Sequence, residues 1–70
     1  MFSKACEYAI RASIYIAAKS QKGLRVGISD VAQKIESPVA FTSKILQKLV
    51  KIGVIQSIKG PGGGFYIESD

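Results

Sequence analysis

The chain contains no histidine and no tryptophan, and its single cysteine is Cys6. Without histidine, neither a Ser-His-Asp triad nor a Cys-His catalytic pair can be built. One cysteine excludes a disulfide within the chain and a zinc site of the Cys/His type. The five acidic residues show no spacing typical of an acid–base pair. We therefore expect that the chain is not an enzyme and that it holds no metal or other cofactor.

Long apolar runs are missing as well. The longest apolar stretches are far shorter than the roughly 20 residues of a membrane span. The N-terminus lacks the continuous apolar core and the small-residue cleavage site of a signal peptide. Seventy residues allow one small domain, which we place over residues 1–70. These features predict a cytoplasmic binding module without a membrane partner.

Acidic residues are few compared with basic ones. Ten Lys and Arg face five Asp and Glu, which gives a formal charge of +5 at pH 7. A small domain with this charge suits a polyanion, with nucleic acid as the first candidate and an anionic membrane surface as the second. The alternative is that the charge serves only solubility.

The first helix is predicted from a cap and from apolar periodicity. Ser3 can cap a helix that begins at Lys4 and runs to about Ser20. Small and apolar side chains recur along it at steps of three and four: Cys6, Ala9, Ile10, Ser13, Ile14 and Ala17. Cys6 is expected on the inner face as a small buried thiol rather than as a redox residue. More apolar residues widen the surface: Tyr8, Ala12, Tyr15 and Ile16. This surface exceeds what one small domain can cover, so we expect self-association or burial against a further helix.

The second helix is short. Residues 24–26 can form a very short strand, after which Gly27 opens a helix that stops at Glu36–Ser37. Its apolar residues fall at i, i+3, i+4 and i+7: Ile28, Val31, Ala32 and Ile35. This spacing predicts a helix with one buried stripe.

The third helix has the clearest start signal. Ser37 as the cap and Pro38 in the first helical position predict a helix that runs from Pro38 to about Ile52. At about 100° per residue, its outward face contains no acid and consists of Ala40, Ser43, Lys44, Gln47, Lys48 and Lys51. The opposite face is apolar: Phe41, Ile45, Leu49 and Ile52, flanked by Val39, Thr42, Leu46 and Val50.

The remaining residues predict a hairpin. Segments 54–59 and 65–67 are rich in β-branched and aromatic residues, and the glycine-rich segment 60–64 separates them. An isolated hairpin is marginally stable, so it should pack on the helices through Ile55, Ile58, Phe65 or Ile67. The glycines are followed by a strand rather than by Lys and Ser or Thr at the start of a helix, which disfavours a nucleotide-binding P-loop.

The predicted fold is mainly α with a small β-hairpin. The order of helix, short strand, helix, recognition helix and two-stranded wing is that of a winged helix-turn-helix. The recognition helix fits the major groove, where Lys44 and Gln47 are long enough to reach base edges. Lys48 and Lys51 can meet phosphates, and Lys59 at the glycine tip offers one charge to a phosphate or to a narrow minor groove.

A specific resemblance rests on residues 52–65, IGVIQSIKGPGGGF. This segment resembles the signature of the Rrf-two family, bacterial winged-helix regulators that include the iron–sulfur cluster regulators. Shorter pieces support it: Tyr8–Ala12 in the first helix, Asp30–Ala32 in the second, and Phe41 with Lys44–Leu46 in the third. The resemblance covers nearly the whole chain.

The resemblance implies a sequence-specific transcription regulator, usually a repressor, that binds a near-palindromic operator in double-stranded DNA as a homodimer. It implies that the third helix reads the major groove and that the wing enters the minor groove. The implied contacts are Pro38, Ala40, Phe41, Ser43 and Lys44 on the helix and Lys59, Gly60 and Pro61 at the wing. Lys4 and Tyr8 are the implied phosphate contacts of the first helix. Phe41 stands where relatives often have Tyr, and it lacks the hydroxyl that could bind a phosphate.

Family members are longer than this chain. Their second half holds a long dimerisation helix and, in many, cysteines that bind an iron–sulfur cluster. Cys6 matches none of those ligand positions, so a cluster is expected only in a C-terminal half that this chain lacks. The alternative function is a winged-helix module for protein–protein interaction. Such a module would show apolar residues on the outer face of the third helix, where this sequence has cations.

Overall fold

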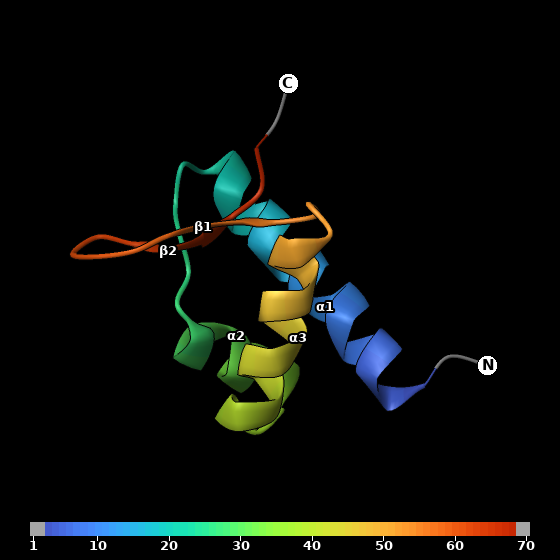
Figure 1. Ribbon diagram of the computed structural model, residues 1–70. Coiled ribbons are helices and arrows are strands. Elements are labelled where there is room, and N and C mark those ends of the chain that lie inside the picture. Colours follow the sequence, from blue (N-terminus) through green and yellow to red (C-terminus); the bar gives the residue numbers. More distant parts are fainter. Residues whose placement is uncertain (1–2, 69–70) are drawn as a thin grey trace.

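In the computed structural model, which describes residues 3–68, three helices pack together and a hairpin projects from them (Figure 1). The helices are α1 (Lys4–Gln21), α2 (Ile28–Ile35) and α3 (Val39–Lys51), and the strands are β1 (Gln56–Ile58) and β2 (Gly64–Tyr66). This is the predicted winged helix-turn-helix order. The predicted strand at 24–26 is reduced to a single bridge between Val26 and Phe65. The two residues at each end of the predicted domain lie outside the described range.

Helix α1 begins as predicted, but a different side of it is buried. The Ser3 hydroxyl oxygen accepts a hydrogen bond of 3.1 Å from the Cys6 amide and so caps the helix. Ala12 and Ile16 are fully buried, whereas Ile14 on the predicted inner stripe is 65% exposed. Cys6 is only half-buried rather than buried as predicted, and it lines a hollow between α1 and α3 together with Ile45 and Leu49. The reason is that α2 and α3 both pack on the side of α1 that carries Ala12 and Ile16.

The turn between α2 and α3 differs from the prediction in its capping. Pro38 is the N-cap residue with extended backbone (φ −58°, ψ 143°), so α3 begins at Val39. Ser37 does not cap the helix, because its hydroxyl donates to the carbonyl oxygen of Pro38 at 3.4 Å. The buried Thr42 hydroxyl donates to that same oxygen at 2.9 Å and ties the turn to the core. Before the turn, Glu36 adopts the left-handed conformation at φ +56° and ends α2.

The core joins all three helices to the start of the hairpin. Its largest fully buried side chains are Ile16, Val31, Thr42, Leu46 and Ile55. On α3 the buried stripe runs through Thr42, Ile45, Leu46 and Leu49. Ile52, predicted to face inward, is 66% exposed because it lies at the C-cap, beyond the part of α3 that packs on the other helices.

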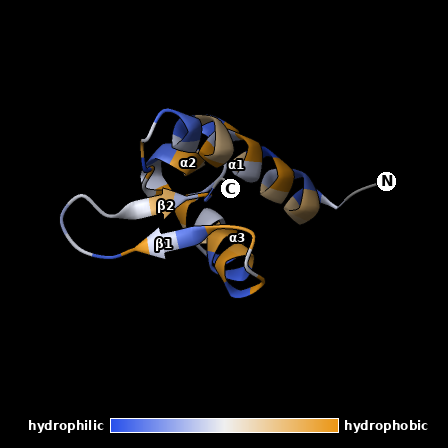
Figure 2. Ribbon diagram, turned by 90° about the horizontal axis from the view of Figure 1, so that it is seen from above, coloured by the Kyte–Doolittle hydropathy of each residue, from blue (hydrophilic) through white to orange (hydrophobic). Residues whose placement is uncertain are grey.

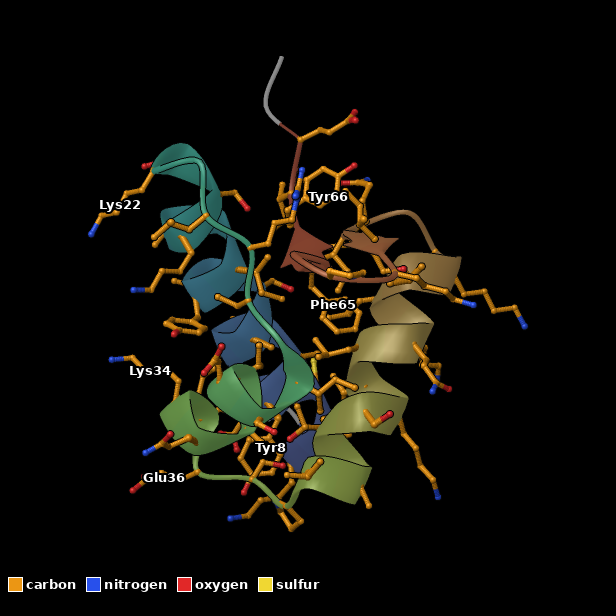
Figure 3. All side chains as sticks on the ribbon, turned by 90° about the vertical axis from the view of Figure 1, so that its left-hand side faces the viewer. Tyr8, Lys22, Lys34, Glu36, Phe65 and Tyr66 are labelled. Atoms are coloured by element: carbon orange, nitrogen blue, oxygen red, sulfur yellow. The ribbon has the colours of Figure 1, made fainter. Side chains whose placement is uncertain are left out.

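The hairpin is anchored on the helices by its second strand. β1 and β2 pair antiparallel, with Ser57 opposite Phe65. Phe65 and Ile67 pack against the core, as predicted, whereas Ile58 is 37% exposed and anchors nothing. The Ile67 amide donates to the Ser20 hydroxyl oxygen of α1 at 2.8 Å. Figure 3 shows Phe65 directed into the molecule and its neighbour Tyr66 on the other side of the strand. The hairpin is therefore a wing with a fixed base and a projecting tip.

Candidate nucleic-acid interface

The outer face of α3 is polar and basic, as the sequence predicts. Ala40, Lys44, Gln47, Lys48 and Lys51 are exposed, and Ser43 is half-buried. No Asp or Glu lies anywhere on α3. Seen from above, the helix has a hydrophilic side turned away from the other helices and a hydrophobic side turned toward them (Figure 2). We call the six residues Ala40, Ser43, Lys44, Gln47, Lys48 and Lys51 the basic face.

Two side chains of the basic face touch each other. The Gln47 amide nitrogen donates to the Ser43 hydroxyl oxygen at 3.4 Å, across one turn of the helix. This contact places the Gln47 amide beside the Ser43 hydroxyl, and both Gln47 and Lys44 are exposed. Glutamine can bond an adenine edge with two hydrogen bonds, and lysine can bond guanine.

At the start of α3 the predicted contacts divide into exposed and packed residues. Pro38 is exposed, and so is Lys4 in the first turn of α1. Phe41 and Tyr8 are half-buried and pack edge to face, with ring centroids 5.6 Å apart and planes at 78°. Both rings also pack against the core. The structure thus brings these two predicted contact residues together, and their first role is to fix α1 against α3.

The wing tip carries the other predicted contacts. Lys59, Gly60 and Pro61 are all exposed. The tip closes through a hydrogen bond of 2.9 Å from the Gly63 amide to the Gly60 carbonyl oxygen. Gly60 has φ +94°, a conformation that side chains rarely adopt, and a Cβ on Gly63 would overlap the Ile58 carbonyl oxygen. The glycines are therefore needed for the turn itself, and they leave a narrow tip.

The wing begins at the C-terminal end of α3, the end that carries Lys48 and Lys51. Only residues 52–55 separate α3 from β1, and the amides of Val54 and Ile55 both donate to the Leu49 carbonyl oxygen, at 2.9 and 3.4 Å. The hairpin then projects away from the three helices (Figures 1 and 2). An exposed helix with a wing at its C-terminal end is an arrangement that can engage a major groove and the next minor groove together.

Sequence reasoning missed Arg25 as part of this surface. Its guanidinium donates to the Gly62 carbonyl oxygen of the wing tip at 3.3 Å and lies 5.7 Å from the centroid of the Tyr66 ring. No sequence signal could have found these contacts, because Arg25 is 37 residues from Gly62 along the chain.

Comparisons with known proteins agree with this geometry. A family model described as Rrf2, an iron-dependent transcriptional regulator, matches residues 2–70. The HTH-type transcriptional regulator IscR of Vibrio vulnificus is 32% identical over 63 residues, which are 90% of this chain and 37% of that protein. A protein of Aquifex aeolicus that carries the name of an HTH-type transcriptional regulator is 33% identical over all of this chain and 47% of its own length. Family and relatives are thus named as regulators rather than as enzymes, as expected.

A solved structure supports the fold. It is described as CymR (YrzC), the global cysteine regulator of B. subtilis, and it matches with a TM-score of 0.85 over 100% of this chain and 54% of the other. At 21% sequence identity, this likeness shows the winged-helix fold alone. The chain spans about half the length, or less, of these relatives.

The iron in the family description does not fit the residues described here. Within residues 3–68, no three side chains of the His, Cys, Asp and Glu types gather where they could hold a metal ion. Cys6 is the chain's one cysteine, whereas iron–sulfur clusters are held by several thiolates. Among these same residues, no helix is both long and apolar enough to cross a bilayer.

Proposed function

The chain belongs to the Rrf2 (Rrf-two) family of transcriptional regulators, and on this premise we propose that it is a module that binds DNA in a sequence-specific way. The observation that carries the proposal is the basic face of α3, which is largely exposed, free of acids and followed by the wing at the C-terminal end of the helix. A polyanion binds most favourably where cations gather without carboxylates among them.

The basic face divides into base-reading and phosphate-binding positions. An α-helix fits the major groove of B-DNA, and the residues near its N-terminal end come closest to the base edges. Ala40 and Ser43 are small enough for a close approach, and Lys44 and Gln47 reach further. Lys48 and Lys51 lie toward the C-terminal end, where side chains of a docked helix meet phosphates. Pro38 and Phe41 place the first turn of the helix, and Lys4 and Tyr8 extend the surface to a neighbouring phosphate.

The wing would enter the minor groove next to the major groove that α3 occupies. Gly60 and Pro61 form a tip without long side chains, so the backbone can come close to the duplex. Lys59 is exposed at the base of this tip and supplies a charge. Narrow minor grooves have a strongly negative potential, which attracts such a cation.

We also propose that the protein acts as a homodimer on a near-palindromic operator in the cytoplasm, as a repressor. Support for the homodimer comes from the uncovered side of α1, where Ile10 is 43% and Ile14 is 65% exposed. These side chains line an apolar hollow together with Leu49 and Val54. A second copy, or a helix from a longer form of the protein, would cover this hollow. A monodisperse monomer in light scattering of the chain would contradict the homodimer.

A cofactor has no place in the proposed DNA contacts. The amine, amide and backbone donors of α3 and the wing are sufficient to bind DNA, and this chain's donor set does not suit iron. An iron–sulfur cluster of the kind known in the family would require cysteines in a C-terminal half beyond this sequence.

Selection of bound duplexes from a random pool tests the proposal. We expect enrichment of one sequence, with half-sites about one helical turn apart if two copies bind symmetrically. The matched control is the double variant Lys44→Ala/Gln47→Ala, which should still bind DNA but no longer enrich that sequence. If the parent chain enriches nothing, specific readout is wrong, and a module for protein–protein interaction becomes the better explanation.

A further inference from the structure

The connector between α1 and α2 is locked to the wing. The Val26 amide donates to the Phe65 carbonyl oxygen at 3.1 Å, and the Phe65 amide donates back to the Val26 carbonyl oxygen at 2.7 Å. A Cβ on Gly64 would lie 2.8 Å from the Val26 carbonyl oxygen and 3.3 Å from the Cβ of Arg25. The connector therefore behaves as a third, one-residue strand of the wing, and the backbones approach so closely that only glycine fits.

Arg25 precedes this bridge, and its side chain follows the wing toward the tip. One guanidinium nitrogen donates to the Gly62 carbonyl oxygen at 3.3 Å, and the group lies over the Tyr66 ring, 5.7 Å from its centroid. The side chain is exposed despite both contacts. The guanidinium group is thus held at the wing tip while it remains exposed.

The chemistry of the guanidinium leaves most of its donors free. Arginine carries five N–H donors in a planar fork. The contacts with Gly62 and Tyr66 use one of these donors and one flat side of the group, so the other donors can serve a further partner. A guanidinium that is already ordered loses less side-chain freedom when it binds an anion, and its fork matches the oxygens of a phosphate.

We propose that Arg25 is a second cation of the wing and binds a backbone phosphate of the DNA beside the groove that the tip enters. This inference rests on the proposed function, because it requires a bound duplex. The wing would then carry two positive charges. Lys59 lies at the end of β1, and Arg25 lies on the connector between α1 and α2. The wing would then hold the duplex at two points rather than one.

The salt dependence of DNA affinity tests this inference. Each phosphate contact contributes about 0.9 to the slope of log affinity against log salt concentration. We expect Arg25→Gln to reduce the magnitude of that slope by about 0.9. If the parent and the variant have equal affinity at about 1 M salt, this change makes the variant bind about eight-fold more weakly at roughly 0.1 M salt. The probe is a labelled duplex selected from the random pool. Its fluorescence anisotropy is measured as the full chain is added, at salt concentrations between about 50 and about 200 mM.

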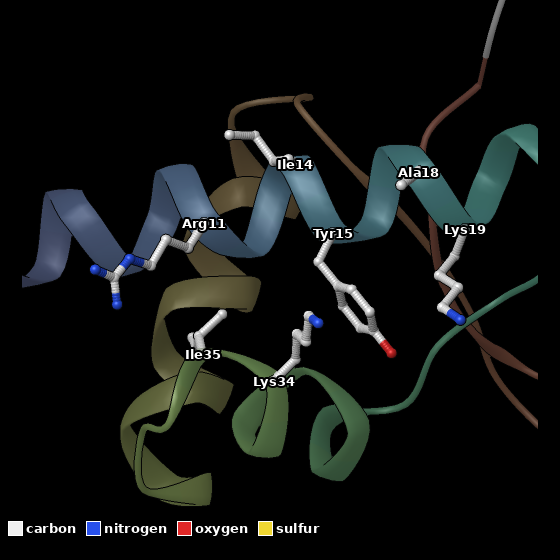
Figure 4. A pocket seen from close by; sticks show the side chains of 7 residues that line it. All are labelled: Arg11, Ile14, Tyr15, Ala18, Lys19, Lys34 and Ile35. Atoms are coloured by element: carbon white, nitrogen blue, oxygen red, sulfur yellow. The ribbon is translucent and has the colours of Figure 1, made fainter.

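Two further variants separate a phosphate contact from a structural role. Arg25→Lys keeps the charge but loses the fork, and it should retain most of the slope. Arg11→Gln removes the same charge from the groove between α1 and α2 (Figure 4), and it should leave the slope unchanged. Thermal unfolding of each variant checks that the fold is kept.

The outcomes are distinct. If Arg25→Lys lowers the slope as much as Arg25→Gln, the contacts with Gly62 and Tyr66 matter and the phosphate contact is wrong. If Arg11→Gln has the same effect as Arg25→Gln, net charge explains the result and the site is wrong. If Arg25→Gln leaves the slope unchanged while the parent binds DNA, only this inference fails. If the parent binds no duplex, the proposed function fails with it.

Discussion

The side-chain amide nitrogen of Gln47 lies 3.4 Å from the hydroxyl oxygen of Ser43, one turn earlier on the exposed side of α3. A partner that docks on this side of α3 would therefore meet the Gln47 amide and the Ser43 hydroxyl side by side. Ordering a long side chain before binding reduces the entropy that the complex must offset. Among the side chains proposed to read bases, Gln47 is the one that contacts another residue of the basic face.

Gln47→Ala is expected to relax the preference at one base position. The loss should be about 1–3 kcal/mol for the preferred base and much smaller for the others. Competition among duplexes that each differ by one base pair measures it. Ser43→Ala is the matched control, because it frees Gln47 without removing its amide, and it should keep the same base preference with weaker affinity. An equal loss for every duplex in the Gln47→Ala variant would contradict base reading.

Lys51→Ala is expected to weaken binding to all duplexes alike. Lys51 lies in the last turn of α3, at the opposite end from the positions proposed to read bases, so we expect it to meet a phosphate. The salt slope should fall by about 0.9 while the ranking of duplexes stays unchanged. Lys22→Ala provides the comparison, since Lys22 is an exposed cation at the end of α1, away from α3 in Figure 3. A changed ranking in Lys51→Ala would show that this residue reads bases.

Gly64→Ala is expected to detach the wing. The added methyl group would sit 2.8 Å from the Val26 carbonyl oxygen at φ +148°, and neither backbone can give way easily. We expect a loss of about 1–3 kcal/mol in the free energy of unfolding, together with weaker DNA binding at unchanged helix content. Urea unfolding followed by circular dichroism gives the first value, and anisotropy gives the second. Gly53→Ala meets open space at φ +85°, so it should cost stability but leave DNA affinity nearly intact.

Glu36→Gly is expected to stabilise the fold. Glu36 ends α2 at φ +56°, where a residue other than glycine is strained by about 1–2 kcal/mol. Glycine removes that strain but adds flexibility to the unfolded chain, so the net gain should be roughly 0.5–1 kcal/mol. Glu36→Gln removes the charge and keeps the strain. The explanation by backbone strain fails if Gln stabilises the protein as much as Gly does.

Several elements could be predicted because local signals sufficed. Helix α2 was predictable because Gly27 precedes a regular apolar stripe that ends at Ile35, and the structure places the helix at Ile28–Ile35. The basic face was predictable because the positions on one side of a helix follow from its fixed rotation per residue. The glycine tip was predictable because glycine is the residue that most readily adopts positive φ values in turns, as Gly60, Gly62 and Gly64 do here.

Other features depended on packing between distant segments. Helix α1 is apolar on more than one side, so periodicity could not tell whether Ala12 or Ile14 faces the core. Ala12 faces the core because α2 and α3 pack on its side of α1. The residue type of Ser37 predicts a cap, but the N-cap of α3 is Pro38. The buried Thr42 hydroxyl donates to the Pro38 carbonyl oxygen, a contact that the local sequence does not reveal.

By itself the sequence determined the order of the elements, the acid-free outer side of α3 and the glycine-rich tip of the hairpin. These depend on interactions within a few residues, which the chain encodes locally. Only the tertiary structure decided that Tyr8 meets Phe41 and that Arg25 joins the wing tip. Such contacts bring together residues far apart in the chain, and their partners are chosen by how whole helices and strands fit one another, which no local pattern specifies.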